Sequence, residues 1–248
     1  MKVFLAGTQG NKGGLIKDKT GLYLLESFIY LNDKTVQLYK NHNFLLDSGA
    51  FTYMNNKKDH KVDWDEYITN YASFINKHDI EHFFELDIDS IVGLKEVERL
   101  RYKLEKLTNK QCIPVWHKSR GKDYWLRMVK DYSYVAIGGI VTKEIMPREY
   151  RFFPWFLNEA KKQDCKVHGL GFTNMKGLRK YPFYSVDSTS WLSGQKFAKI
   201  QIFNGRDFDN YQPSKEGGSK LRGINPKKRL EHNFNEWVKF SKYAEHNL

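Results

Sequence analysis

The sequence predicts a single α/β domain of the (β/α)8 TIM-barrel type over residues 1–248. Three observations support this: strand-like stretches alternate with helical ones, eight such strands can be counted, and the length suits a fold of roughly 250 residues. An open, doubly wound sheet is the alternative. It is disfavoured because no GxGxxG motif follows any expected strand, and neither a domain boundary nor an internal repeat divides the chain.

Short apolar runs that end abruptly in polar residues or glycine indicate the strands, because a buried parallel strand becomes polar where it surfaces. The clearest run ends in Asp47-Ser48-Gly49. We expect strands over residues 3–6, 44–47, 82–88, 112–117, 134–140, 166–172, 183–187 and 197–203.

Apolar residues at helical spacing predict the helices between these strands. A helix should begin after Asp63, because Glu66 lies three residues further on and the two fit an N-terminal capping box. Its buried face is marked by Trp64, Tyr67, Ile68, Tyr71, Phe74 and Ile75. Other helices are expected over residues 22–31, 94–107, 122–130, 148–162 and 233–243, with a short one around residue 176.

The formal net charge of +12 at pH 7 favours a polyanionic partner, with nucleic acid ahead of an anionic membrane surface. A lysine-rich composition without any such partner is the alternative interpretation. Segment 207–229 concentrates basic residues and could contact phosphates, while a solvated loop is an equally weighted alternative. Its candidate nucleic-acid contacts are Lys215, Lys220, Arg222, Lys227, Lys228 and Arg229.

The two cysteines, Cys112 and Cys165, each begin an apolar run, and we expect both to be buried, reduced thiols. Neither lies in a CxxC pair, and no HExxH or EF-hand spacing points to a metal. No apolar run approaches a membrane span, and the N-terminus does not resemble a signal peptide. We therefore expect a cytoplasmic protein that uses no metal or cofactor.

Acidic side chains and one histidine stand at the ends of several expected strands. Side chains alternate along a strand, so Leu45 and Asp47 share one face, as do Val115 and His117. A barrel would gather in one pocket Asp47, Asp87 or Asp89, His117 and Asp187. Separated carboxylates in one pocket can divide acid, base and nucleophile roles, and they suit attack at an anomeric carbon.

Each of these residues also has a structural interpretation. Asp47 and Asp187 could cap the helices that follow their strands. Asp87 and Asp89 could bind a metal ion, and His117 could be a hydrogen-bonded histidine of the core. Spacing along the chain does not choose between these interpretations.

Several short motifs resemble those of the tRNA-guanine transglycosylase family, in the same order. Residues 47–52 (DSGAFT) resemble its DSGG(F/Y)Q motif, and residues 138–141 (GGIV) resemble its GGLAVGE loop. Residues 167–172 (VHGLGF) are similar to its LMGVG strand, and residues 186–191 (VDSTSW) to its FDCVxPTR segment. Leu86-Asp87 resembles the (L/F)DEC element. The pattern is most similar to the short, phage-type DpdA branch, which modifies DNA with 7-deazaguanines.

This resemblance implies an exchange of bases at C1′ of a nucleotide by double displacement. Asp187 would be the nucleophile that forms a covalent intermediate, and Asp47 would be the general acid/base. Phe51 would stack on the purine, and Asp87 would accept hydrogen bonds from its N1–H and 2-amino groups. Close backbone approach or further substrate contacts are expected at Ser48, Gly49, His117, Gly138, Gly139 and Gly169.

Departures from the family pattern shape the expected substrate. The family's C-x-C-x2-C…H zinc site near the C-terminus is missing, which weakens a tRNA substrate and strengthens DNA. Trp116-His117 replaces the glutamine expected after the valine of the fourth strand, and the arginine of PTR is not evident. The expected partners are DNA with its target base flipped out or unpaired, and a free 7-deazaguanine similar to preQ0. A helper protein could open the duplex.

Three alternatives stand beside this interpretation. A zinc-free tRNA-guanine transglycosylase would perform the same chemistry on RNA. A nucleoside or DNA glycosidase would use water in place of the incoming base. A basic nucleic-acid-binding barrel without catalysis would use the strand-end carboxylates only for structure.

Overall fold

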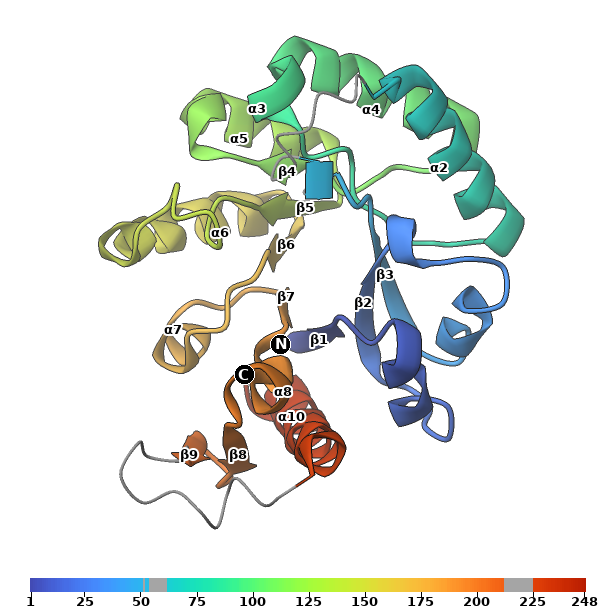
Figure 1. The fold of residues 1–248 in the computed structure, drawn as a ribbon. Coiled ribbons are helices and arrows are strands. Elements are labelled where there is room, and N and C mark those ends of the chain that lie inside the picture. The colour runs from blue at the N-terminus through green and yellow to red at the C-terminus, as the bar shows by residue number, and fades with distance from the viewer. Residues whose placement is uncertain (51, 54–61, 212–224) are drawn as a thin grey trace.

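The computed structural model describes residues 1–50, 52–53, 62–211 and 225–248. Seven parallel strands form one curled sheet in the order β3-β2-β1-β7-β6-β5-β4, with helices arranged around its outer side (Figure 1). The strands are β1 (Lys2–Ala6), β2 (Tyr23–Ser27), β3 (Asn43–Asp47), β4 (Val115–Trp116), β5 (Tyr134–Ile137), β6 (Lys166–Gly169) and β7 (Ser185–Ser188). The predicted α/β class with a parallel sheet is confirmed.

Helices follow most of the strands, as the apolar spacing predicts. The side chain of Asp63 accepts a hydrogen bond from the backbone N–H of Glu66, which confirms the predicted start of α2. The helices are α2 (Trp64–His78), α3 (Asp89–Val92), α4 (Leu94–Thr108), α5 (Gly121–Asp131), α6 (Phe153–Lys162), α7 (Met175–Lys180), α8 (Ser193–Phe197) and α10 (Pro226–Asn247). Short 3-10 helices are η1 (Gly10–Leu15), η2 (Phe28–Tyr30), η3 (Val36–Tyr39), η4 (Lys118–Arg120), η5 (Pro147–Phe152) and η6 (Ser190–Leu192).

The helix predicted over residues 22–31 is wrong, because this stretch forms β2 followed by η2. Tyr23 and Leu25 pack on one side of the sheet, whereas Leu22 and Leu24 pack on the other. A strand buried on both sides is apolar throughout, and a short apolar run does not reveal whether it is strand or helix.

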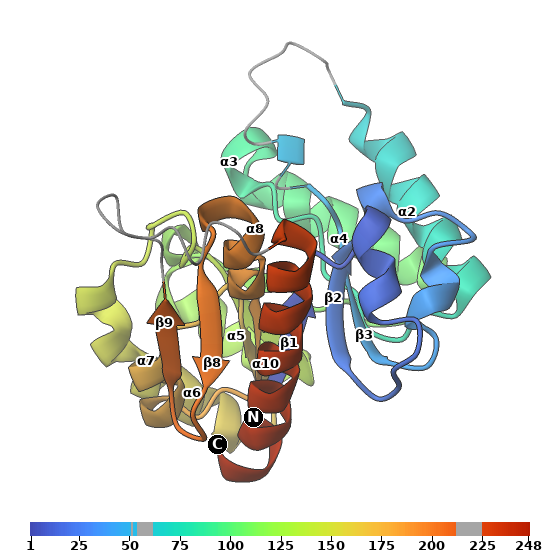
Figure 2. The same ribbon diagram turned by 60° about the horizontal axis from the view of Figure 1, so that its bottom comes forward.

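The strand predicted over residues 197–203 forms as β8 (Ile200–Phe203), but it does not join the curled sheet. It pairs antiparallel with β9 (Phe208–Tyr211), and Figure 2 shows this pair beside α10. Side chains of α10 bind its backbone: Asn233 accepts from the Gln201 N–H and Glu236 from the Phe203 N–H. The basic segment 207–229 therefore begins one residue before β9 and ends in the first turn of α10.

The chain between α2 and α3 connects the two edge strands of the sheet. The Phe84 N–H donates to the Leu46 carbonyl at 2.9 Å, and the Ile113 N–H donates to the Phe83 carbonyl at 2.8 Å. Here the strand predicted over residues 82–88 is reduced to isolated parallel bridges. The hydroxyl of the buried Tyr71 on α2 lies 3.2 Å from the Leu46 carbonyl oxygen and 3.1 Å from that of Phe84, so α2 holds this junction from outside.

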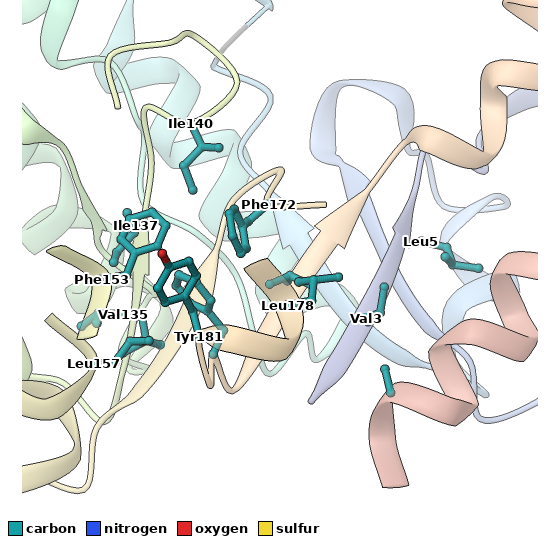
Figure 3. Packing of buried hydrophobic residues seen from close by; sticks show 14 of the residues in the cluster. Val3, Leu5, Val135, Ile137, Ile140, Phe153, Leu157, Phe172, Leu178 and Tyr181 are labelled. Carbon is teal, nitrogen blue, oxygen red and sulfur yellow. The ribbon is translucent and has the colours of Figure 1, made fainter. Parts of the chain in front are cut away.

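Alternate residues of the strands face opposite sides of the sheet, as a pleated strand requires. Outward residues such as Val3, Val135 and Ile137 pack against the surrounding helices, and Figure 3 shows part of this core. Asp47 follows Leu45 by two positions and therefore belongs to the inward set. That set forms a separate apolar cluster of Phe4, Ala6, Tyr23, Leu25, Leu45, Phe84, Ile113, Val115, Tyr134 and Ala136.

The buried carboxylate of Glu85 lies at the junction of the sheet edges. Its Oε1 accepts from the Val115 N–H at 2.7 Å and from the Arg120 guanidinium at 3.0 Å, while Arg101 reaches Oε2 at 3.2 Å. Arg120 also donates to both oxygens of Asp89, at 3.0 and 2.6 Å. Burial raises the pKa of Glu85, and the two arginine charges and the Val115 N–H oppose that rise. This network ties segment 85–89 to segment 115–120.

Both cysteines are buried free thiols, as predicted. Burial raises the pKa of each thiol above its ordinary value, so neither is a reactive thiolate at neutral pH. Within the described ranges, no helix is long and apolar enough to cross a membrane.

We expect Arg120→Met to lower the free energy of unfolding by about 3–5 kcal/mol, because it leaves the Glu85 carboxylate buried without its main counter-charge. Urea denaturation followed by circular dichroism measures this. Arg99→Met is the matched control, since Arg99 pairs with Asp65 and Glu96 on the exposed side of α4 and should cost below about 1 kcal/mol. Equal losses in the two variants would contradict the structural role of the Glu85 network.

Candidate active site

Asp47 ends β3, and the turn after it fixes its carboxyl group. The Gly49 N–H donates to Oδ1 at 2.6 Å. Gly49 has φ +77°, and a Cβ there would lie 2.7 Å from Ser27 Oγ, so this turn requires glycine. Burial raises the pKa of Asp47 to about 6, and the negative charges of Asp87 and Asp187 add to the rise. A carboxyl group with this pKa can both give and take a proton near neutral pH.

Asp187 is a buried residue of β7 with one carboxylate oxygen firmly held. Its Oδ1 accepts from the Gly171 N–H at 2.6 Å and lies 3.3 Å from Nε2 of the fully buried His168. The other ring nitrogen of His168 lies 2.7 Å from Ser185 Oγ, which orients the imidazole. No hydrogen bond from a described residue engages Oδ2 of Asp187. One oxygen is therefore fixed by the protein while the other is available for chemistry.

His117 follows β4 and lies between two carboxylates. Its Nδ1 is 2.8 Å from Glu144 Oε2, and its Nε2 contacts Asp87 Oδ1. Burial lowers the pKa of His117, but the two carboxylates outweigh burial and raise it to about 10. The bond with His117 in turn lowers the pKa of Glu144. The imidazole is therefore protonated at neutral pH and donates through both nitrogens, which fixes the position of Asp87.

Gly138 and Gly139 make room for the residues around His117. A Cβ at Gly138 would lie 2.8 Å from His117 Cε1, and one at Gly139 would lie 2.8 Å from Glu144 Oε2. Side chains of His117 and Glu144 thus lie against these glycines, and close approach of the substrate base to their backbone stays a prediction. A Cβ at Gly169 would instead meet the core residue Phe172 at 3.1 Å, so the space there serves packing.

The structure brings together the strand-end residues that the sequence singles out. Asp87 contacts His117, and the Asp47 carboxyl group feels the charges of both Asp87 and Asp187. Asp89 is the exception, because both of its oxygens bind Arg120. Ser48 is buried behind Asp47, with its Oγ 3.4 Å from the Ala50 N–H. The Asp187 carboxylate accepts from the N–H of Gly171 in the loop after β6, so among the described contacts it does not cap the helix that follows β7.

The other predicted contacts are only partly described. Phe51, Lys215, Lys220 and Arg222 lie outside the described residues. Lys227 and Lys228 are exposed in the first turn of α10 and can meet a phosphate. The phosphate contact of Arg229 stays a prediction; in this structure Arg229 is buried, and its guanidinium approaches the Gly194 carbonyl. The reason is that this side of α10 packs against α8.

Sequence reasoning missed three residues of the site: Glu144, His168 and Gly171. A signal for Glu144 was present, because the final glutamate of the family loop GGLAVGE falls on it when GGIVTKE is aligned. His168 and Gly171 lie inside the motif at residues 167–172, but nothing along the chain indicates that they reach the Asp187 carboxylate.

One group among the described residues has the composition of a metal site. Ligand atoms of Asp87, Asp89 and His117 lie within 4.8 Å of one another. Binding a metal here would require His117 to lose a proton and Arg120 to leave Asp89. In this structure the three residues take part in ion pairs: His117 with Asp87, and Arg120 with Asp89.

No family model and no curated protein matches this sequence. Among solved structures, the chain is similar to a protein of Coccidioides immitis described as a fructose-1,6-bisphosphate aldolase, with TM-score 0.54 and 11% identity over 99% of this chain and 87% of that chain. It also matches the carboxyl transferase domain of Rhizobium etli pyruvate carboxylase, with TM-score 0.47 and 13% identity over 98% of this chain and 48% of that chain. The first likeness concerns the fold alone, and the resemblance to transglycosylases stays a prediction.

We expect the stability contributed by His117 to disappear at high pH. Its pKa is raised from an ordinary 6.5 to about 10, so its ion pairs stabilise the fold fully below about pH 6.5 and are lost as pH rises through 10. His117→Gln should therefore unfold at lower urea concentration than the wild type at pH 6 and show a smaller difference at pH 10.5. His246→Gln, at the exposed end of α10, is the control. A pH-independent difference would rule out a protonated His117.

Proposed function

We propose that this protein is a DNA-guanine transglycosylase that exchanges guanine in DNA for a 7-deazaguanine base by double displacement at C1′. One observation carries the proposal: two carboxyl groups in different environments, at the ends of β3 and β7, are close enough for the charge of Asp187 to raise the pKa of Asp47. Asp187 has one oxygen held and the other available, while the pKa of Asp47 is raised to about 6. The transglycosylase-like motifs around both residues supply the type of reaction.

In the first displacement, Oδ2 of Asp187 attacks C1′ of the target nucleotide. The bond between C1′ and N9 breaks, and its electron pair leaves with guanine, which takes a proton from Asp47. The products are a glycosyl ester on Asp187, neutral guanine and ionised Asp47. The Gly171 N–H on Oδ1 keeps the carboxylate aligned during the attack.

In the second displacement, ionised Asp47 removes the proton from N9 of the incoming 7-deazaguanine. N9 then attacks C1′, and the bond from C1′ to Asp187 breaks with its electron pair returning to the carboxylate. Two inversions at one carbon retain the β-configuration. One glycosidic bond replaces another, so the proposed reaction needs no redox cofactor or nucleotide.

Asp87 is proposed to read the base. Its carboxylate would accept from N1–H and the 2-amino group of guanine, which the deazaguanine shares. His117 occupies Oδ1 of Asp87 and is itself held by Glu144, so the free side of Asp87 has a defined direction. This charged row takes the place of the glutamine that the family pattern has near this strand.

We further propose that the sheet closes into a (β/α)8 barrel, with residues 82–85 as the fourth strand and residues 113–116 as the fifth. The bridges from Leu46 to Phe83 and from Phe84 to Ile113 support closure, as does the single apolar cluster of inward residues. Closure would put Asp47 and Asp187 at the mouth formed by the C-terminal ends of the strands, where barrels of this kind hold their chemistry.

We expect the wild type to incorporate a labelled 7-deazaguanine into DNA and Asp187→Asn to lose all incorporation, because an amide cannot form the glycosyl ester. Mass spectrometry of nucleosides from treated DNA measures this. Asp79→Asn, at the exposed C-terminal end of α2, is the control and should retain the wild-type rate. Incorporation into tRNA but not into DNA would indicate the tRNA-guanine transglycosylase alternative. Release of guanine without incorporation would indicate a glycosidase. Exchange by Asp187→Asn would contradict the assignment of Asp187 as the nucleophile.

We expect Asp47→Asn to slow exchange by at least about 100-fold while making the fold more stable at pH 7. The pKa of Asp47 is raised from 3.8 to about 6, so wild-type stability falls as pH rises between these values and stays reduced above them. Two pKa units at roughly 1.4 kcal/mol each give a gain of up to about 3 kcal/mol at pH 7 and almost none near pH 3. Urea denaturation at both pH values, beside the exchange assay, measures this; wild-type turnover would falsify the acid/base role.

A further inference from the structure

We propose that an aromatic cavity beside the active site binds a nucleobase next to the target nucleotide on the same DNA strand. This rests on the proposed function only for the identity of the nucleic acid. The cavity has a volume of about 220 Å³ and lies between α5 and the segment formed by η5 and α6. Figure 1 shows α5 and α6 as neighbours on the outer side of the sheet.

The walls of the cavity are suited to a flat ring. Trp116, Phe152, Phe153 and Phe156 line it. The Trp116 indole N–H already donates to the Gly121 carbonyl at 2.8 Å, so this side chain offers an apolar surface with no unpaired polar group. Apolar cavities of about 150 Å³ accept a benzene ring, and the larger volume here has room for a single nucleobase.

The rim of the cavity is basic. Lys118 and Lys122 line it, and Arg148 and Arg151 are exposed on the adjoining η5. Glu149 is the acidic residue of the lining, and it is paired with Lys118 at 2.5 Å. Aromatic surfaces beside cationic side chains are the equipment with which proteins stack the bases and hold the phosphates of a single strand. The charge pattern therefore favours a nucleotide over a neutral aromatic molecule.

The cavity and the active site share two loops. Lys118 directly follows His117, and Ile145 of the cavity directly follows Glu144. A strand whose target base lies at Asp87 therefore has the cavity beside its path. Phe152 is 47% exposed at the opening, and the Arg151 guanidinium lies over its ring at 5.1 Å from the centroid, so a base stacking on Phe152 would lie beside a cation.

The test is a scan of single-stranded oligonucleotides about a dozen nucleotides long, each with one guanine and one abasic site at a stepped position. Binding to full-length Asp187→Asn protein is measured by fluorescence anisotropy. At one position beside the guanine, the abasic site should weaken binding roughly 10-fold. Adding Phe152→Ala should weaken binding to the intact strand by a similar factor and remove the effect of that abasic site. Phe197→Ala, on the exposed surface of α8, is the matched control and should change neither.

The proposal is overturned if Phe152→Ala binds the intact strand as tightly as its parent. It is equally overturned if the loss of affinity caused by Phe152→Ala and the loss caused by an abasic site are additive at every position. It is also overturned if Phe152→Ala abolishes a concentration-dependent dimer in size-exclusion chromatography, which would assign the cavity to a second copy of the chain. Binding does not require exchange. A protein that shows the Phe152-dependent effect but never exchanges guanine contradicts only the transglycosylase function, and the reverse result contradicts only the cavity.

Discussion

The buried carboxylate of Glu85 is the contact on which both the sheet and the candidate site depend. It accepts a hydrogen bond from the Val115 N–H, so a side chain takes the place of a strand partner where only isolated bridges join the sheet edges. Its negative charge also pairs with the Arg120 guanidinium. Arg120 then binds Asp89 and fixes the chain on either side of Asp87. Because His117 lies between Val115 and Arg120, the same network sets the position of His117 relative to Asp87. The geometry of the site is therefore an outcome of how the sheet edges are joined.

The electrostatics of the site follow from how unevenly its carboxylates are compensated. Asp87 and Glu144 share a protonated imidazole, and Asp187 has the Gly171 N–H and His168. Asp47 has the Gly49 N–H but no cation, and it faces the charges of its acidic neighbours. Burial raises the pKa of Asp47, and these neighbouring charges add to the rise. The residue best able to move a proton is thus one whose ionised form weakens the fold, a conflict typical of functional sites.

Much of the fold could be predicted from local patterns, and its errors have definite causes. The capping pair of Asp63 and Glu66 marks the start of α2 because both partners lie within one helical turn. The sequence of residues 22–31 predicts a helix, whereas the structure has a strand, because a strand buried on both sides shows no alternation of apolar and polar residues. Residues 200–203 form β8 within the predicted stretch 197–203, but this strand pairs with β9 and is bound by side chains of α10. A local sequence pattern does not indicate which element a strand will pair with. The burial of Arg229 could not be predicted, because it depends on the packing of α10.

The sequence by itself determined which side chains end the strands and which side of the sheet they face, because strand alternation is a property of the local backbone. It thereby predicted one site that contains Asp47, His117 and Asp187. Only the tertiary structure decided their chemical state. Asp87 and Glu144 raise the pKa of His117 and keep it protonated, and Gly171 and His168 orient Asp187. Burial, together with charges from other strands, raises the pKa of Asp47. Burial and Coulomb interactions act through space between residues far apart in the chain, so a pattern read along the sequence cannot contain them.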